Sequence, residues 1–248
     1  MNNFIKKIVL FGIFILLLQT KAYALWNVDL ETGYVFNDYN FARIPNEGGT
    51  KISLSQELNI DPAIFYRVKF DYYLRKNKKI SLLIAPLSLD AEGRIDKNVS
   101  FNGVDFSSNT DLKAKYRFDA YRITYQYSFP RTRHFQIGIG CTGKIRDAAI
   151  SLEGDRKKTQ KTNTGFVPLF NFKIDYFIND FIKCVCEGDA LVGPSGRAED
   201  ILLALEYAVS NSVDIKVGYR ILEGGADVDE VYNFALLHYV LGGLIYSF

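Results

Sequence analysis

Alternation of apolar and polar residues, repeated along most of the chain, is the feature that most limits how this sequence can fold. From Trp26 to Phe36 the even-numbered residues are mostly large and apolar, and Asn27, Asp29 and Glu31 lie between them. The same pattern recurs in Ile64–Tyr72, Phe135–Cys141, Phe170–Tyr176, Ile201–Val209 and Ile215–Ile221. A period of two is typical of β-strands. The sequence therefore predicts an all-β protein with no helix of consequence.

The connections between these segments alternate between long and short along the chain. The predicted short connections are 75–79, 130–133, 178–180 and 210–212, and the long ones are 37–61, 91–115, 153–164, 192–199 and 223–230. This arrangement gives ten strands, at approximately 26–36, 62–74, 80–90, 116–129, 134–152, 165–177, 181–191, 200–209, 213–222 and 231–248. Thr50–Ser55 also alternates; if it is a wall strand, the count changes. Eight and twelve strands remain as alternatives.

One predicted strand changes phase in its middle. Tyr116 and Phe118 place the apolar residues at even positions, whereas Tyr121, Ile123 and Tyr125 place them at odd positions. A β-bulge near Ala120 would reconcile the two halves by inserting one extra residue. Two separate strands or a misplaced boundary would also do so.

The first 24 residues are predicted to be a secretory signal peptide. Lys6 and Lys7 give its positive start, Ile8–Leu18 its apolar segment, and Ala22–Ala24 a small-x-small cleavage site. The apolar segment is too short for a membrane-spanning helix, which takes roughly 20 residues. Three of the 30 Lys and Arg residues lie here, so the mature chain from Leu25 has 27 basic against 28 acidic residues. A nucleic-acid partner is therefore not expected, and export argues against a cytoplasmic enzyme.

The three cysteines do not predict a disulfide framework or a metal site. Their number is odd, and Cys184 and Cys186 lie two residues apart, which places both on one face of a strand without the geometry for a bridge. With Cys141, they are interpreted as small apolar residues on an apolar face. Neither of the two histidines has a Cys or His at ligand spacing, so no metal and no cofactor is expected.

Alternation by itself fits both a soluble lipocalin-like barrel and an outer-membrane barrel, which differ in the side that carries the apolar residues. Three features favour the membrane barrel. The polar face mixes both charge signs, as in Arg67, Lys69 and Asp71, which suits a narrow lumen where charges can pair. Aromatic residues gather at strand ends, as interfacial girdles require. The alternating loop lengths fit short periplasmic turns and longer outer loops.

The last strand, Tyr232–Phe248, resembles the terminal strand of bacterial outer-membrane barrels. It ends in Phe248 with an aromatic residue, Tyr246, two positions earlier. In that class of protein the terminal aromatic is part of the signal that the barrel-assembly machinery reads. The resemblance covers the architecture of the whole mature chain, residues 25–248, and the motif of its last strand. In kind it is similar to the small OmpA-type and OmpW-type barrels of Gram-negative cell envelopes, and no loop motif of either is matched.

The inward face of such a barrel would carry many charges, and they are predicted to pair and close the lumen. A ten-stranded barrel lies near the eight-stranded size, at which side chains fill the interior, and buried charges must pair. The inward set has nine basic and seven acidic members: Asp29, Glu31, Arg67, Lys69, Asp71, Arg122, Lys144, Arg146, Lys173, Asp175, Lys183, Glu187, Glu206, Asp214, Lys216 and Arg220.

The two histidines are considered as candidate catalytic residues, because some small outer-membrane barrels are enzymes. If Phe248 faces lipid, His238 does too, because the two have the same parity; a Ser-His-Glu triad with Ser247 and Glu206 is not evident. His134 is expected in a turn or the lumen. Proteases resembling omptins use acids and an Asp-His pair at the outer rim. Asp227, Asp229 and Glu230 cluster in the last outer loop, and Glu230 lies eight residues before His238. No omptin motif is recognisable, and no catalytic residue is assigned.

Two predicted loops have a distinctive composition. Arg156, Lys157, Lys158 and Lys161 make one outer loop strongly basic, which suits either binding of lipopolysaccharide phosphates or ordinary solvation. Gly48–Gly49 and Gly224–Gly225 are interpreted as tight turns.

The expected protein is a monomeric barrel of the cell outer membrane with a surface or structural role and no enzymatic activity. Its expected partners are outer-membrane lipid, lipopolysaccharide and, during biogenesis, the barrel-assembly machinery. The alternatives are an enzyme that modifies lipid A or phospholipids, and a narrow channel for small solutes.

Overall fold

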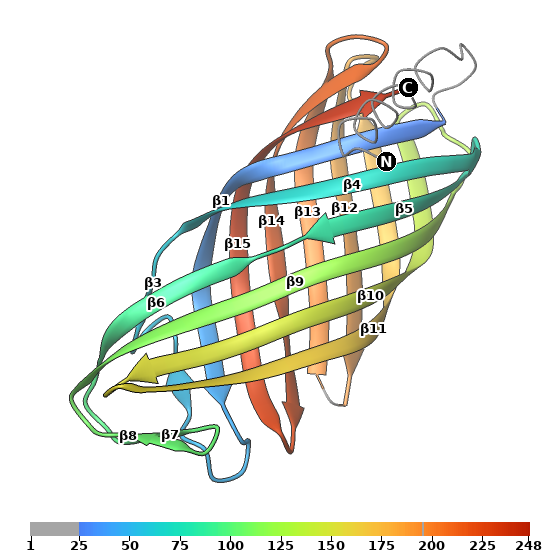
Figure 1. Ribbon diagram of the computed structural model, residues 1–248. Coiled ribbons are helices and arrows are strands. Elements are labelled where there is room, and N and C mark those ends of the chain that lie inside the picture. Colours follow the sequence, from blue (N-terminus) through green and yellow to red (C-terminus); the bar gives the residue numbers. More distant parts are fainter. Residues whose placement is uncertain (1–24, 195) are drawn as a thin grey trace, which may run out of the picture.

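A computed structural model of the protein describes residues 25–194 and 196–248. The described chain is all-β and forms one closed antiparallel barrel with ten wall positions (Figure 1). The predicted signal peptide, Met1–Ala24, lies outside the described residues. No helix in the described ranges is long and apolar enough to cross a membrane.

Each wall position corresponds to one of the ten predicted strands, so the predicted number and order are confirmed. Nine positions are single strands, and the third is formed by β5 and β6 in succession, which both pair with β9. The wall consists of β1 (Trp26–Arg43), β4 (Ala63–Arg75), β5 (Lys78–Ala85) with β6 (Ser88–Ile95), β9 (Thr110–Ser128), β10 (Phe135–Gly154), β11 (Lys157–Phe177), β12 (Ile182–Gly193), β13 (Gly196–Ala208), β14 (Val213–Val228) and β15 (Val231–Ser247).

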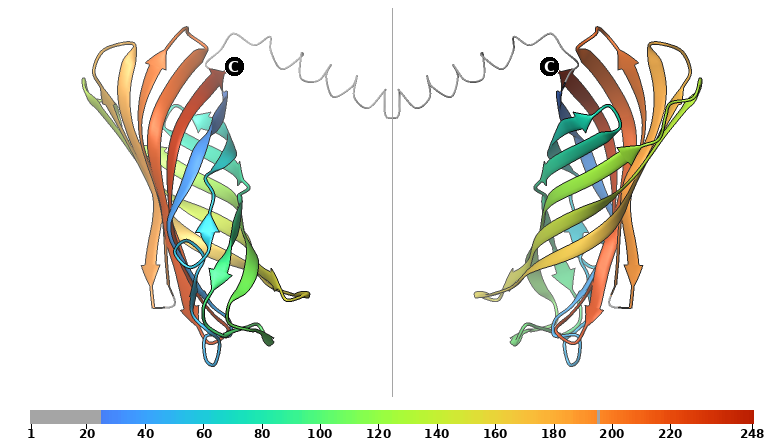
Figure 2. Two further views of the ribbon diagram at one scale, coloured as in Figure 1. Left: turned by 90° about the vertical axis from the view of Figure 1, so that its left-hand side faces the viewer. Right: turned by 90° about the vertical axis from the view of Figure 1, so that its right-hand side faces the viewer.

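The barrel closes between its first and last strands. β1 pairs with β15 from Asn27 opposite Ser247 to Arg43 opposite Tyr232, with a bulge at Asp38. Phe248 completes this seam, because its N–H donates to the carbonyl of Trp26 (3.0 Å) and its carbonyl accepts from the N–H of Trp26 (3.2 Å). The termini of the described chain and the short connections lie at one end, here called the turn end, and the long hairpins lie at the other, the hairpin end (Figures 1 and 2).

Most of the predicted long loops are wrong, because the wall strands continue through them. The predicted loop 153–164 is a two-residue turn at Asp155 and Arg156, both at positive φ as a tight hairpin requires. Gly224–Gly225 is likewise part of β14 and not a turn. A side chain at Gly225 would collide with Asn233 and Phe234, so the glycine permits close strand packing. Gly48, at φ +86°, does lie in a turn.

Four short strands lie at the hairpin end apart from the wall order. β2 (Ile52–Ser53) falls in the Thr50–Ser55 segment and pairs with β1, without becoming a wall strand. β3 (Asn59–Ile60) pairs with β6, and β7 (Val99–Phe101) pairs with β8 (Val104–Phe106) as a separate hairpin. Four of their apolar side chains are buried in the core at this end of the barrel: Ile52, Val99, Phe101 and Phe106.

The predicted bulge near Ala120 is wrong. β9 pairs in uninterrupted register with β10, and its pairing with β5 and β6 keeps one register across their break. Even-numbered residues of β9 face inward along its whole length, from Leu112 to Gln126. The apolar pattern changes phase because the surroundings change. Near the turn end the inside is polar and the outside apolar, whereas near the hairpin end the reverse holds.

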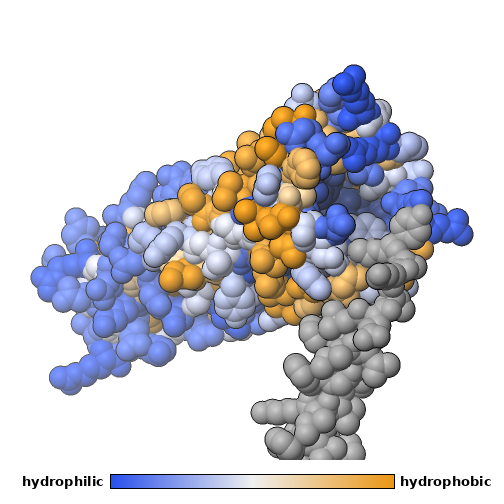
Figure 3. All heavy atoms as spheres, turned by 90° about the horizontal axis from the view of Figure 1, so that it is seen from above, coloured by the Kyte–Doolittle hydropathy of each residue, from blue (hydrophilic) through white to orange (hydrophobic). Residues whose placement is uncertain are grey.

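These two parts of the wall are called the belt half and the hairpin half. In the belt half, large apolar side chains point outward from all ten wall positions; one from each is Leu30, Ile64, Leu82, Tyr121, Ile137, Phe166, Val192, Leu203, Val217 and Val240. On the face shown in Figure 3, hydrophobic side chains gather in a band with hydrophilic surface on either side. In the hairpin half, the inside holds an apolar core that includes Phe101, Phe106, Leu112 and Leu152.

Aromatic residues border the belt at both edges, as predicted. At the turn end, the rings of Trp26 and Tyr72 lie 4.4 Å apart and those of Tyr246 and Phe248 5.6 Å apart. At the other edge, Tyr39 stacks with Phe41, and Tyr232 packs with Phe234. The cysteines are unpaired and lie on the belt strands, with Cys141 between Tyr125 and Phe170, in agreement with their interpretation as small apolar residues.

Candidate functional site

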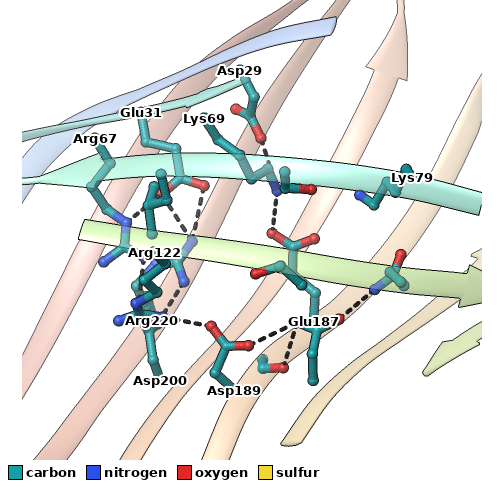
Figure 4. Close-up of a pocket in the computed structure, with 16 residues that line it drawn as sticks. Asp29, Glu31, Arg67, Lys69, Lys79, Arg122, Glu187, Asp189, Asp200 and Arg220 are labelled. Carbon is teal, nitrogen blue, oxygen red and sulfur yellow. Dashed lines mark hydrogen bonds and ion pairs between the residues drawn. The ribbon is translucent and has the colours of Figure 1, made fainter. Parts of the chain in front are cut away.

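Charged side chains from most of the wall strands meet inside the belt half (Figure 4). Asp200 of β13 lies at the centre of one cluster and receives three guanidinium groups. Arg122 and Arg220 each approach its carboxylate to 2.6 Å, and Arg67 approaches to 3.0 Å. The Asp200 side chain is only 4% exposed. Three cations around one buried acid require further acids nearby, because an uncompensated buried charge is costly.

Glu31 and Asp189 supply that compensation. Glu31 accepts from Arg220 (2.9 Å) and from the Lys216 amine (2.7 Å), and Arg67 lies 3.4 Å from it. On the other side, Asp189 pairs with Arg122 at 2.7 Å. Asp189 also accepts from Thr142 and Asn171. The cluster is thus a continuous network of alternating charge that joins six of the wall strands.

A second group lies nearer the turn end and has Lys69 at its centre. Its amine lies 2.8 Å from Glu187 and 3.4 Å from Asp29, and Figure 4 shows it between these two acids. Three further pairs extend the set across the lumen: Lys79 with Asp71 (3.1 Å), Lys173 with Asp175 (3.5 Å) and Lys183 with Glu206 (2.9 Å). The space left among the network residues is about 60 Å³, which holds a few water molecules. The belt half is therefore filled.

Thirteen of the sixteen charged residues predicted to face the lumen take part in these pairs. Lys144 and Arg146 instead line a separate cavity, and Asp214 is partly exposed near the turn end. The predicted set lacked Lys79, Asp189 and Asp200. Parity could have identified Asp189, which lies two residues beyond Glu187, and Asp200, which lies six residues before Glu206. Both lie near the ends of the predicted strands 181–191 and 200–209.

A second cavity, of about 370 Å³, lies in the hairpin half and is called the outer cavity. Its walls are largely apolar, with Tyr116, Phe118, Ile150 and Leu222 among them. The outward neighbours of Tyr116 on β9 are Lys115 and Arg117, so this part of the strand lies beyond the belt. Burial raises the pKa of the Tyr116 phenol well above its usual range, so the hydroxyl stays neutral. No sequence motif indicated this cavity.

Among the described residues, neither histidine lies beside the serine or the acid of the triad that was considered. His238 lies on the outward face of β15, as its parity predicted, and its Nδ1 lies 2.6 Å from the Tyr219 hydroxyl. Glu206 instead pairs with Lys183 in the lumen. Ser247 is nine residues further along β15, about 30 Å away at roughly 3.4 Å per residue. His134 lies in a turn-end connection near the carbonyl of Phe177.

The acids of the last hairpin hold neighbouring segments in place. Asp227 accepts from the Asn46 side chain at 2.7 Å, and the Asp229 carbonyl accepts from the Asn46 N–H. Glu230 pairs with Lys161 of β11 at 3.1 Å. In the described ranges no group of three or more His, Cys, Asp and Glu residues is placed to hold a metal ion.

The predicted basic loop is the tip of the β10–β11 hairpin, and most of its charges have partners within the chain. Lys158 pairs with Glu153 at 3.0 Å, and the Lys157 amine donates to the Asp105 carbonyl at 2.6 Å. Other cations lie closer to the belt. The Lys51 amine lies 4.6 Å from the ring centre of Phe41 and 4.9 Å from that of Tyr232. Sequence analysis did not identify this cationic and aromatic surface.

Comparison with solved structures identifies the fold class. The outer membrane protease OmpT from Escherichia coli matches with a TM-score of 0.56 and 11% identity, over 93% of this chain and 99% of OmpT. The attachment invasion locus protein Ail of Yersinia pestis matches with a TM-score of 0.41 and 8% identity, over 90% of this chain and 99% of Ail. No protein-family model and no curated protein matches the sequence. The protein has the fold of the small bacterial outer-membrane β-barrels, with ten strands in its wall.

Proposed function

We propose that this protein is an integral outer-membrane barrel that does not conduct solutes and acts in a structural or surface role, without enzymatic activity. The turn end would face the periplasm and the hairpin end the cell exterior. The observation that carries the proposal is the charge network of the belt half, in which cations and acids from opposite walls meet directly. A lumen closed by paired charges holds the wall rigid and leaves no path for a solute.

The outward surface supports insertion in a lipid bilayer. Apolar side chains surround the belt half, and aromatic residues border it at both edges, which is the arrangement that a bilayer with two interfaces requires. Phe248 takes part in the closing seam, and Tyr246 packs beside it. This position supports the proposal that the barrel-assembly machinery handles the last strand as the barrel closes. The proposed assembled form is a monomer, because the wall closes within one chain.

Lipopolysaccharide is the proposed partner at the outer edge of the belt. Lys51 lies over the rings of Phe41 and Tyr232, and Arg43 lies over the ring of Tyr232. A phosphate at the interface could meet a charge here, and an acyl chain could meet a ring. Arg197 lies similarly over Phe234, although it also pairs with Glu223. These side chains point away from the lumen and therefore do not compete with the charge network.

Planar-bilayer recording tests the closed lumen. Purified protein should give no stable single-channel current, and Asp200→Asn should give current noise if it folds, because it removes the charge that three guanidinium groups share. Steady nanosiemens steps from the unmodified protein would contradict the proposal. Mass spectrometry of envelope lipids, with expression on and off, tests the absence of enzymatic activity. A new lipid A or phospholipid species would replace the proposal with a lipid-modifying enzyme.

A further inference from the structure

The wall of the barrel is incomplete beside the outer cavity. β11 pairs with β10 along its whole length but with β12 only from Phe170 opposite Ala190 to Phe177 opposite Lys183. Pro168, which has no backbone N–H, lies two residues beyond the last pair. From there the β10–β11 hairpin and the β12–β13 hairpin diverge, as Figures 1 and 2 both show.

The outer cavity lies beside this gap. Its lining includes Val167 on the β11 side and Leu191 and Gly193 on the β12 side, as well as residues of the opposite inner wall. The outward residues beside the gap are apolar: Phe166 is 69% exposed and Val192 is 71% exposed. The gap therefore lies at the outer edge of the belt, where an apolar chain in the outer leaflet would face it.

Two cations enter the cavity without an acidic partner. Lys144 is 4% exposed, and among the described residues no carboxylate lies within ion-pair distance of it. Its closest described interaction is with the Phe118 ring, whose centre is 4.7 Å from the amine. Arg146 donates to the neutral Asn163 side chain, and its Nε has no hydrogen-bond partner. This arrangement differs from that of the belt half, where the buried cations of the network face acids.

We infer that the outer cavity binds a single-chain amphiphilic anion, with its carboxylate or phosphate headgroup on Lys144 and Arg146 and its chain along the apolar walls. An isolated buried cation is costly, and two that converge on one cavity favour an anionic ligand. Tyr116, Phe118 and Ile150 provide a surface that favours a hydrocarbon chain over a hydrophilic solute. The inference goes beyond the proposed function, because a closed belt half is compatible with either an empty or an occupied outer cavity.

The size of the cavity limits the ligand. A volume of about 370 Å³ is near the lower end of the range for small-molecule sites, roughly 300–1,000 Å³. It suits one chain of moderate length and excludes a lipid with several acyl chains. Beyond the gap, Lys161 pairs with Glu230 and joins β11 to the tip of the β14–β15 hairpin.

Native mass spectrometry of the full barrel, in a short-chain neutral detergent, tests the inference. Titration with dodecanoate should give a one-to-one complex, and titration with dodecyl phosphate in a second arm shows which headgroup binds more tightly. Dodecanol should bind at least about tenfold more weakly, because it cannot form charge-assisted hydrogen bonds to the two cations. Equal binding of dodecanol and both anions would overturn the inference.

Variants place the ligand in this cavity. Lys144→Met with Arg146→Met should weaken anion binding about tenfold or more and leave dodecanol binding unchanged. Ala148→Trp, which fills the cavity, should abolish binding of all three compounds. Lys158→Met removes an exposed charge from the hairpin tip and should bind as the parent does. Heat-dependent migration on gels identifies folded variants, and Lys144→Gln alone serves if the double variant does not fold. Unchanged anion affinity in a folded Lys144 variant, or no complex with the parent protein, would overturn the inference.

Discussion

The belt half and the hairpin half are built from the same strands with the same inward parity, yet their chemistry is opposite. On β9, Arg122 and Thr124 face inward in the belt half and Ile123 faces outward. Ten residues earlier on the same strand, Leu112 faces inward and Lys113 outward. The backbone geometry does not change between these points, so the surrounding medium accounts for the inversion. In the proposed membrane-inserted form, lipid around the belt favours apolar outward residues, and water around the hairpins favours polar ones.

The phase of a hydrophobic pattern therefore indicates the environment of a strand as well as its register. The side chains inside each half must also be stabilised by contacts with one another. The belt half achieves this with paired charges, which depend on every partner being present. The hairpin half achieves this with apolar packing, which tolerates local loss. The two halves should therefore respond differently to the removal of an interior side chain.

The largest effect is expected from Asp200→Ala. It leaves Arg67, Arg122 and Arg220 without the acid they share, and removal of one partner from a buried ion pair costs about 3–5 kcal/mol. The unboiled, folded band on gels should disappear at a much lower temperature than in the parent. Asp90→Ala is the matched control, because Asp90 forms an exposed pair with Lys115 that is worth about 0–1 kcal/mol. Equal heat resistance in both variants would show that the network does not stabilise the wall.

A smaller and more local effect is expected from Leu152→Ala in the core of the hairpin half. Leu152 is fully buried, and such a truncation costs about 2–5 kcal/mol. Because the belt half does not rest on this core, limited proteolysis should cut the hairpins faster while the belt fragment stays resistant. Ser151→Ala, at the neighbouring outward position, should leave the cleavage rate unchanged. Loss of belt resistance in Leu152→Ala would show that the two halves unfold together.

The third effect concerns the outer surface of one strand. Ile123→Arg places a charge on the apolar belt and should cost about 2–4 kcal/mol if it lies near the centre of the bilayer. Lys113→Ile, on the same face of β9 in the hairpin half, should change the free energy of unfolding by less than about 0.5 kcal/mol. Urea titration in lipid vesicles, followed by tryptophan fluorescence, measures both. A similar small change for the two variants would place Ile123 outside the bilayer.

Most of the belt half could be predicted from the sequence, but little of the hairpin half could. The number and order of wall strands followed from alternation and turn spacing, because the belt residues Leu30, Ile123 and Ile137 obey a simple rule of apolar outside and polar inside. In the hairpin half that rule is reversed, so strands there were interpreted as loops. The phase change at Ala120 was the visible sign of the boundary, and its interpretation as a bulge was wrong.

The candidate sites divide in the same way. Charges such as Glu31, Arg67 and Arg220 could be assigned to the lumen because parity determines which face a side chain takes. The outer cavity could not be predicted, because it depends on where β11 separates from β12. That separation depends on the unequal lengths of β11 and β12 and on the hairpins that diverge from them. The residue pattern of one strand alone does not reveal it. That no described carboxylate forms an ion pair with Lys144 is likewise visible only in three dimensions.

The seam between Trp26 and Phe248 has a consequence for the order of folding. Every other wall contact joins successive wall positions along the chain, whereas this one brings together residues separated by almost the whole described chain. The entropy of closing so large a loop must be overcome before β1 and β15 gain their hydrogen bonds, so closure of the seam is expected late. Until then both edge strands expose unpaired backbone, which is a template for aggregation. A chain that lacks its last residues would remain in that open-edged state, and its survival in the cell would depend on chaperones and proteases.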